Sequence, residues 1–263
     1  MCQEIKEELH MKIYEICFSP TGGTKKVSSL LTSALEGESV LVDLTNSQAD
    51  FHSIALTEED VAVISVPSYA GRVPAVAAER LAMIDGHGAR AVLVCVYGNR
   101  AYEDTLVELQ DVEKQAGFCV TAAVAAIAEH SIMHQFASGR PDMDDMNQLK
   151  RFAKEVKEKI DASILTEVQV KGNHPYKELK EVPFHPTASD LCTMCGLCAK
   201  LCPVHAIPFD APNQTKEEQC ISCMRCIQVC PSKARHLNEQ MLSAVSEKMK
   251  PLFAKRKENE LFL

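Results

Sequence analysis

Short apolar runs alternate with longer amphipathic stretches along the first 165 residues of the chain. The apolar runs predict buried strands at Met11–Phe18, Ser39–Leu44, Asp60–Ser68, Ala89–Gly98 and Phe118–Ala128. Apolar residues at helical spacing predict helices at Lys25–Glu36, Pro74–Ile84, Tyr102–Ala116 and Asp142–Ile160. Continuous apolar strands that alternate with helices are typical of a parallel, doubly wound sheet. The pattern therefore predicts an α/β domain over residues 1–165.

This alternation stops after residue 165. Residues 166–187 contain prolines and show no periodicity, which predicts a linker. Residues 188–236 hold most of the cysteines and predict a second, small domain. Residues 237–263 predict a helical tail, with a helix at Leu237–Met249 that Pro251 interrupts.

Composition and charge narrow the class of protein. Hydrophobic residues make up 46% and charged residues 24% of the chain, as in ordinary globular proteins. The net charge of -8 and the lack of a basic stripe argue against nucleic acid as a partner. No apolar stretch approaches the roughly 18 residues of a membrane span, and the first ten residues lack the pattern of a secretory signal. We expect a cytoplasmic protein with no membrane partner.

Eight of the twelve cysteines lie between Cys192 and Cys230. In a reducing compartment, this number of cysteines favours metal or redox chemistry over a disulfide scaffold. A shift of 28 positions aligns the run C-x2-C-x2-C-x3-C-P that begins at Cys192 with a second run that begins at Cys220. Zinc knuckles or metal-free structural cysteines are the alternative, but a tetrahedral zinc site gains nothing from a third cysteine three residues further on.

The doubled run resembles bacterial-type ferredoxins with two 4Fe-4S clusters over roughly residues 188–236. In those proteins three cysteines of one run share a cluster with the last cysteine of the other run. The resemblance implies a C-terminal α+β domain with two crossed ligand sets. Cluster 1 would take Cys192, Cys195, Cys198 and Cys230, and cluster 2 would take Cys202, Cys220, Cys223 and Cys226.

In a doubly wound sheet, ligands bind beyond the carboxyl ends of the strands. The loop after the first predicted strand reads SPTGGT, and its hydroxyls and glycines at a helix start suit a phosphate. The candidate phosphate ligands are Ser19, Thr21, Gly22, Gly23 and Thr24. Lys25 and Lys26 follow and would add positive charge. The alternative is a loop whose hydroxyls only cap the helix.

This loop resembles the first loop of flavodoxins, [ST]-x-T-G-x-T, and the resemblance covers about residues 11–162. It implies a five-stranded sheet of order 2-1-3-4-5 with FMN between the first and third strands. It also implies that the loops PSYAGRVP and YGNRAYEDT hold the isoalloxazine ring, with Tyr69 or Tyr102 stacked on it. The candidate ring contacts are Pro67, Ser68, Tyr69, Ala70, Gly71, Tyr97, Gly98, Asn99, Arg100 and Tyr102. Packing or surface exposure is the alternative for each tyrosine.

Three residues near the expected ring are candidates for catalysis. Arg72 or Arg100 beside the ring would favour an anionic reduced flavin, and salt bridges to Glu103 or Asp104 are the alternative. His130 could hydrogen-bond the flavin or carry a proton, and a hydrogen bond that fixes its loop is the alternative.

The whole chain resembles anaerobic flavodoxin–ferredoxin fusion proteins. This resemblance implies an electron-transfer protein with FMN and two 4Fe-4S clusters, because clusters pass single electrons while a flavin holds one or two. Its partner would be a redox protein or a small electron acceptor, and we expect the linker to pack so that one cluster faces the flavin. Two alternatives are a ferredoxin-dependent flavin reductase, acting on a small substrate stacked on FMN, and a redox sensor.

Overall fold

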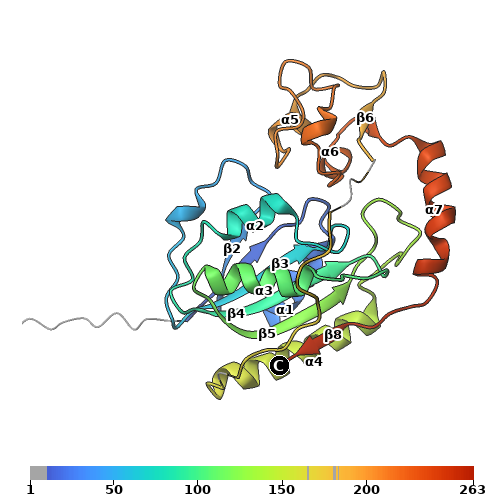
Figure 1. Cartoon of the computed structure of the whole chain (residues 1–263). Helices are drawn as coiled ribbons and strands as arrows, with labels where there is room; N and C mark the ends of the chain where they lie inside the picture. Colours follow the sequence, from blue (N-terminus) through green and yellow to red (C-terminus); the bar gives the residue numbers. More distant parts are fainter. Residues whose placement is uncertain (1–10, 165, 180–181, 183) are drawn as a thin grey trace, which may run out of the picture.

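A six-stranded sheet forms the centre of the computed structural model, which describes residues 11–164, 166–179, 182 and 184–263 (Figure 1). Residues 1–10, with Cys2, lie outside the described residues. The parallel strands are β1 (Lys12–Cys17), β2 (Glu38–Asp43), β3 (Val61–Pro67), β4 (Arg90–Tyr97) and β5 (Cys119–Ile127). Their order, β2-β1-β3-β4-β5, is the predicted flavodoxin-like order.

Helices cover both faces of this sheet. One face packs against α1 (Gly23–Ala34) and α4 (Met143–Asp161), and the other packs against α2 (Ala75–Leu81) and α3 (Thr105–Gln115). Alternate residues of a strand point to opposite faces, so Val63 enters one apolar cluster and its neighbour Ile64 the other. Burial on both faces explains why the strands read as continuous apolar runs. Before β3 the chain adds a short 3-10 helix, Phe51–Ser53.

The cysteine domain, which in the structure includes Thr187 and extends to His236, repeats one backbone conformation twice. Its helices α5 (Leu197–Lys200) and α6 (Arg225–Gln228) each follow a left-handed residue, Gly196 in the first half and Met224 in the second. A 3-10 helix lies at Glu217–Gln219, and a small sheet joins β6 (Thr187–Ala188) to β7 (Arg235–His236). The α+β architecture agrees with the prediction.

The tail differs from the prediction in two ways. Helix α7 (Glu239–Phe253) continues past Pro251, so the expected interruption is wrong. Pro251 lies in the last turn on an exposed face, where water can satisfy the freed carbonyl, and Phe253 stacks on Phe136 with ring centroids 4.2 Å apart. The chain then ends in an unpredicted strand, β8 (Glu260–Phe262), antiparallel to β5.

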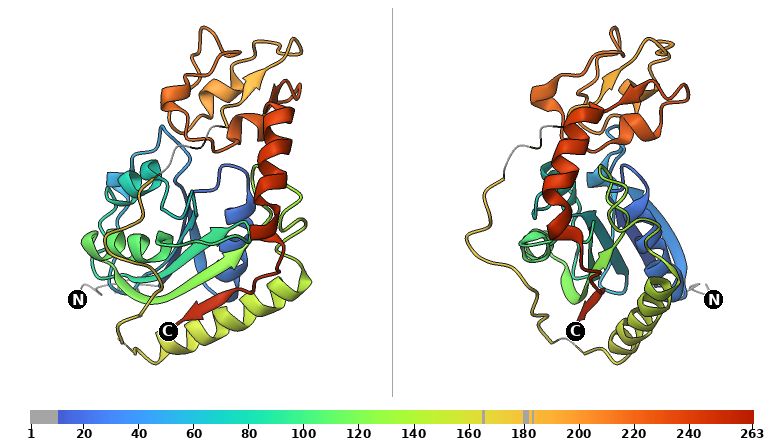
Figure 2. Two further views of the ribbon diagram at one scale, coloured as in Figure 1. Left: turned by 45° about the vertical axis from the view of Figure 1, so that its right-hand side comes forward. Right: turned by 90° about the vertical axis from the view of Figure 1, so that its right-hand side faces the viewer.

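The linker runs back along α3 on the opposite side of the molecule from α7 (Figure 2). Gln110 of α3 donates to the Val168 carbonyl (2.8 Å), and the Asp104 carboxylate accepts from the backbone of Asn173 and Lys177. Linker and tail therefore attach the cysteine domain to the α/β domain from two sides. Among the described helices, none is long and apolar enough to cross a membrane.

Candidate functional site

The eight cysteines of the cysteine domain line two separate cavities. Four of them line one cavity, hereafter cavity 1: Cys192, Cys195, Cys198 and Cys230. The other four line a second cavity, hereafter cavity 2: Cys202, Cys220, Cys223 and Cys226. Each set contains one cysteine from the opposite run, as the resemblance to two-cluster ferredoxins implied.

The thiols stand around each cavity instead of meeting at one point. Within the described part of the chain, no three His, Cys, Asp or Glu side chains are placed to hold a single metal ion. A cubane cluster has a different requirement, because its four irons occupy separate corners and each takes one thiolate. The donor set and its placement therefore fit a cube in each cavity.

The repeated backbone gives both crossing cysteines the same hydrogen bond. The Ala206 N–H donates to Cys202 Sγ (3.3 Å), and the Ala234 N–H donates to Cys230 Sγ (3.2 Å). Hydrogen bonds to ligand sulfurs are one of the factors that tune a cluster's potential. Each half of the domain thus donates a backbone hydrogen bond to the cysteine that it contributes to the other half's ligand set.

The two cavities differ in exposure. Cys195 of cavity 1 is exposed, whereas Cys202 and Cys223 of cavity 2 are buried. Burial raises the pKa of the Cys223 and Cys226 thiols to about 12 each. At Cys230 of cavity 1 burial also acts to raise the pKa, but hydrogen bonds from neighbouring backbone N–H groups outweigh it and lower the pKa. Cys198 of cavity 1 is buried as well, so the difference is that cavity 1 contains the one exposed cysteine of the eight.

The predicted phosphate loop leads directly into α1. Ser19 Oγ accepts from the Lys25 N–H (2.9 Å), so this hydroxyl has the capping role that was the alternative. The N–H groups of Gly23 and Thr24, at the first two positions of the helix, have no acceptor within it and suit an anion. The expected positive charge of Lys25 is neutralised, because its ammonium pairs with the Glu15 carboxylate at 2.8 Å. The N–H groups at the start of α1 therefore fit a phosphate, and of the two lysines only Lys25 is paired within the described part of the chain.

The second loop lies between the sheet and cavity 2. Backbone hydrogen bonds of 3.0 Å in both directions between Tyr69 and Arg72 close it into a tight turn. The Tyr69 ring packs against the apolar core and lies close enough to Cys223 and Cys220 that, after burial, they contribute to raising the pKa of its hydroxyl. Of the two predicted stacking residues, Tyr69 is thus the one at the border of the cysteine domain.

The side chains of the third loop, which was expected to contact the flavin ring, are packed against other parts of the chain. Tyr102 is buried edge-to-face against Tyr97, with centroids 5.2 Å apart, and its hydroxyl donates to Glu260 Oε1 (3.2 Å). Tyr102 therefore has the packing role that was its alternative. Asn99 is also buried, with its side chain bonded to the tail, so its expected contact with the flavin is left to its backbone.

The three candidates for catalysis are all held by other groups of the chain. Arg72 forms a two-point salt bridge with Glu108 (2.7 Å), which is neither of the partners named in its alternative, while Arg100 does pair with Glu103 (2.9 Å) as its alternative had it. His130 Nδ1 accepts the N–H groups of Ile132 and Met133, which fixes the loop after β5. Burial, followed by nearby positive groups, lowers the pKa of His130 to about 4, so its ring is neutral.

Two arginines join the cysteine domain to the edge of the sheet. Arg80 of α2 donates to the carbonyl of Pro203, next to Cys202, at 2.6 Å. Arg225 of α6 donates to the carbonyl of Pro20 in the predicted phosphate loop at 3.3 Å. Ile221, beside Cys220, packs against the apolar core of the sheet. Cavity 2 therefore faces the predicted flavin loops, in agreement with the expected arrangement.

Sequence reasoning missed both arginines. Arg80 carries no sequence signal, because its partner lies 123 residues away. Arg225 carries one, since the repeat places this charged residue where the first half has Leu197. A charge at one copy of a repeated apolar position can indicate a contact that only this copy makes.

Comparison with known proteins supports the two halves separately. Residues 191–234 match the model of the 4Fe-4S dicluster domain. This match favours iron-sulfur clusters over zinc knuckles. No curated protein matches the chain.

Similar solved structures include three flavodoxins. That of Streptococcus pneumoniae TIGR4 is 17% identical and covers 57% of this chain and 98% of its own, with a TM-score of 0.39. A flavodoxin from the domain Archaea is 14% identical, covers 57% and 99%, and has a TM-score of 0.42. Flavodoxin 1 of Bacillus cereus is 14% identical, covers 56% and 97%, and has a TM-score of 0.40.

The strand order of this chain, and not these neighbours, defines the class of its first half. Five parallel strands in the order 2-1-3-4-5, with helices on both faces, make it a flavodoxin-like α/β domain. The chain is thus a fusion of such a domain with a 4Fe-4S dicluster domain. The family match thus supports iron-sulfur clusters in the second half, and the strand order supports a flavodoxin-like fold in the first.

Proposed function

We propose that the protein transfers electrons between FMN, held by the loops after β1, β3 and β4, and two 4Fe-4S clusters, held in cavities 1 and 2. The observation that carries this proposal is the contact between the two domains: Arg225, which lines cavity 2, donates to the carbonyl of Pro20 in the loop after β1 at 3.3 Å. When bound, FMN can hold a pair of electrons and the clusters pass them singly. The physiological partner would be a redox protein or a small electron acceptor.

The two cavities lie at different distances from the flavin loops. Ile221 and Arg225 close cavity 2 against the flavin loops, which excludes water from that side. Cys195 of cavity 1 is exposed, so a partner can approach this cavity from solvent. The proposed path for electrons therefore runs from the flavin loops through cavity 2 and cavity 1 to the surface.

Among the described residues, no specific contact favours the alternative of a flavin reductase. That function would use Arg72, Arg100 or His130, and each is bonded within the chain. No dedicated feature favours a redox sensor either. We include a cytoplasmic and anaerobic setting in the proposal, because the twelve cysteines of the sequence suit a reducing compartment.

Anaerobic reconstitution of the full chain tests the cofactor content. We expect about eight irons, about eight acid-labile sulfides and about one FMN per chain, since each cube contains four of each atom. Release of the flavin by acid and its chromatography would identify it. A chain that binds about four irons, or a flavin other than FMN, would contradict the proposal.

Serine substitutions test the crossed ligand sets. We expect Cys202→Ser and Cys220→Ser to lose the same cluster signal in electron paramagnetic resonance of the reduced protein, and Cys230→Ser and Cys192→Ser to lose the other signal. Each variant should retain about half of the iron. Cys119→Ser, in β5, is the control and should retain all of it. If Cys202→Ser instead matched Cys192→Ser, the crossed assignment would be wrong.

A further inference from the structure

The side chain of Asn99, in the third flavin loop, is bonded almost entirely to the C-terminal tail. Its Nδ2 donates to the carbonyls of Phe253 (2.9 Å) and Lys255 (3.0 Å). Its Oδ1 accepts from the Lys257 N–H (3.0 Å) and from Arg140 (3.4 Å). Asn99 is only 4% exposed and has a left-handed backbone, with a φ of 67°. These bonds fix the loop in this left-handed conformation, which asparagine tolerates better than most residues do.

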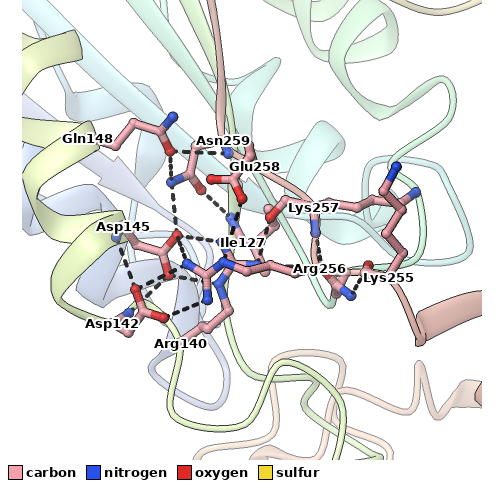
Figure 3. Close-up of polar contacts among 11 residues, drawn as sticks. Ile127, Arg140, Asp142, Asp145, Gln148, Lys255, Arg256, Lys257, Glu258 and Asn259 are labelled. Carbon is pink, nitrogen blue, oxygen red and sulfur yellow. Dashed lines mark hydrogen bonds and ion pairs between the residues drawn. The ribbon is translucent and has the colours of Figure 1, made fainter.

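A buried ion pair fixes the tail next to this loop (Figure 3). Arg140 forms a two-point salt bridge with Asp145, and both side chains are almost fully buried. Arg140 also donates to the Lys257 carbonyl at 2.9 Å. The position of the tail therefore depends on charges that belong to the α/β domain.

Asn259 completes this attachment at the start of β8. Its Oδ1 accepts from the Ile127 N–H at the end of β5 (2.9 Å). Its Nδ2 donates to Gln148 (2.7 Å) and Asp145 (3.1 Å) of α4. Figure 3 shows Asn259 between these partners. Asn259 makes no contact with the third loop in these hydrogen bonds, although it anchors the segment that does.

Helix α7 connects the same tail to the cysteine domain. Near its start, Leu242 and Val245 pack with Met224, which adjoins Cys223 of cavity 2. At its end, Phe253 packs with Met133 and Phe136 from the loop after β5. One continuous helix therefore spans from the wall of cavity 2 to the residue whose carbonyl Asn99 binds.

We propose that the C-terminal tail, residues 253–262, is a structural part of the flavin site, and that Asn99 is the positioning residue through which it acts. The tail fixes the third loop, residues 98–103, and through α7 this loop keeps its place relative to cavity 2. This inference rests on the proposed function, because the loop is a flavin loop only if FMN binds there. The dependence of the loop on the tail does not need a flavin and can be measured without one.

Two variants of the full chain separate this role from general stability. Asn99→Gly removes the side chain, and glycine accepts the positive φ at this position. Asn259→Ala removes an anchor of the tail while every residue of the third loop stays the same. The control is Gln110→Ala, which removes a buried hydrogen bond of 2.8 Å to the linker instead of the tail. The measurements are amide hydrogen exchange of residues 98–103, the dissociation constant of FMN, and the thermal midpoint.

We expect both tail variants to raise hydrogen exchange in the loop and the FMN dissociation constant, each by about tenfold. Gln110→Ala, at a similar loss of thermal midpoint, should change both by less than about twofold. Unchanged exchange in Asn99→Gly and Asn259→Ala would overturn the inference. Increased exchange with an unchanged FMN constant would refute the flavin part of it.

The same experiment distinguishes failure of the proposed function. If the unaltered chain bound no FMN, the proposed function would be wrong, and with it the role of Asn99 in flavin binding. Hydrogen exchange would still decide whether the tail fixes the loop. An effect of Gln110→Ala as large as that of Asn259→Ala would show that only general stability is at work.

Discussion

Gly71 shows how one residue can shape the second and third loops together. A Cβ at this position would lie 1.9 Å from Glu103 Oε2, and the backbone φ is 89°. Glu103 in turn pairs with Arg100. The glycine therefore allows the two loops to touch, whether or not a flavin approaches it.

We expect Gly71→Ala to destabilise the chain by about 3 kcal/mol, because the collision adds to the cost of a left-handed alanine. Gly139→Ala is the matched control, since its φ is 74° and nothing lies within 4 Å of the added atom. It should cost only about 1 kcal/mol. Urea unfolding of both variants measures the difference, and equal costs would contradict the steric account.

Glu113 of α3 is a buried carboxylate whose oxygens find no hydrogen-bond partner among the described residues. Burial raises its pKa from 4.5 to about 8. The folded chain then binds a proton that the unfolded chain releases above pH 4.5, so Glu113 costs stability progressively as the pH rises toward 8.

Glu113→Gln should therefore increase stability more at pH 8 than at pH 5, by about 3 kcal/mol. The free energy of unfolding in urea at both pH values, for variant and parent, measures this difference. A benefit that does not change with pH would show that Glu113 is not protonated in the folded chain.

At the scale of elements, the interior strands could be predicted and the added strand could not. Burial on both faces requires apolar residues along the whole of β3 and β4, and this requirement is visible in the sequence. β8 has only three residues and exists because β5 offers an open edge. β8 pairs with a strand that lies over 130 residues earlier in the chain, so no local sequence pattern could predict the pairing.

The start of α4 shows the same dependence on distant contacts. Asp142 and Asp145 form a capping box there, and Asp145 also pairs with Arg140 and accepts from Asn259 of the tail. The capping residues can be read from the sequence. The ion pair and its link to the tail cannot, because they arise when three segments meet.

We expect Asp145→Asn to cost about 3–5 kcal/mol, because it leaves the Arg140 guanidinium buried without its counter-charge. Lys154→Ala removes an exposed ion pair of 3.9 Å on the same helix and should cost less than about 0.5 kcal/mol. Chemical denaturation of the two variants measures these costs. A small loss for Asp145→Asn would mean that water or another group compensates the arginine.

At the scale of the whole molecule, the contents of the two halves were predictable, but their contacts were not. The doubled cysteine run implied the two ligand sets through its family resemblance, and the structure places those sets around separate cavities. The loops at the carboxyl edge of the sheet were also expected to meet. We expected one cluster to face the flavin loops, but the sequence did not indicate which one. The partners of Arg80 and Arg225 depend on docking between domains, so only the folded structure shows that it is cavity 2.

Electron transfer within one molecule tests the central claim most directly. The reconstituted protein would be mixed anaerobically with a substoichiometric reductant, and the absorbance of flavin and clusters followed over time. We predict that electrons redistribute between flavin and clusters at a rate independent of protein concentration, because cavity 2 adjoins the flavin loops in the same chain. A rate proportional to protein concentration, or no exchange between flavin and clusters, would contradict the account.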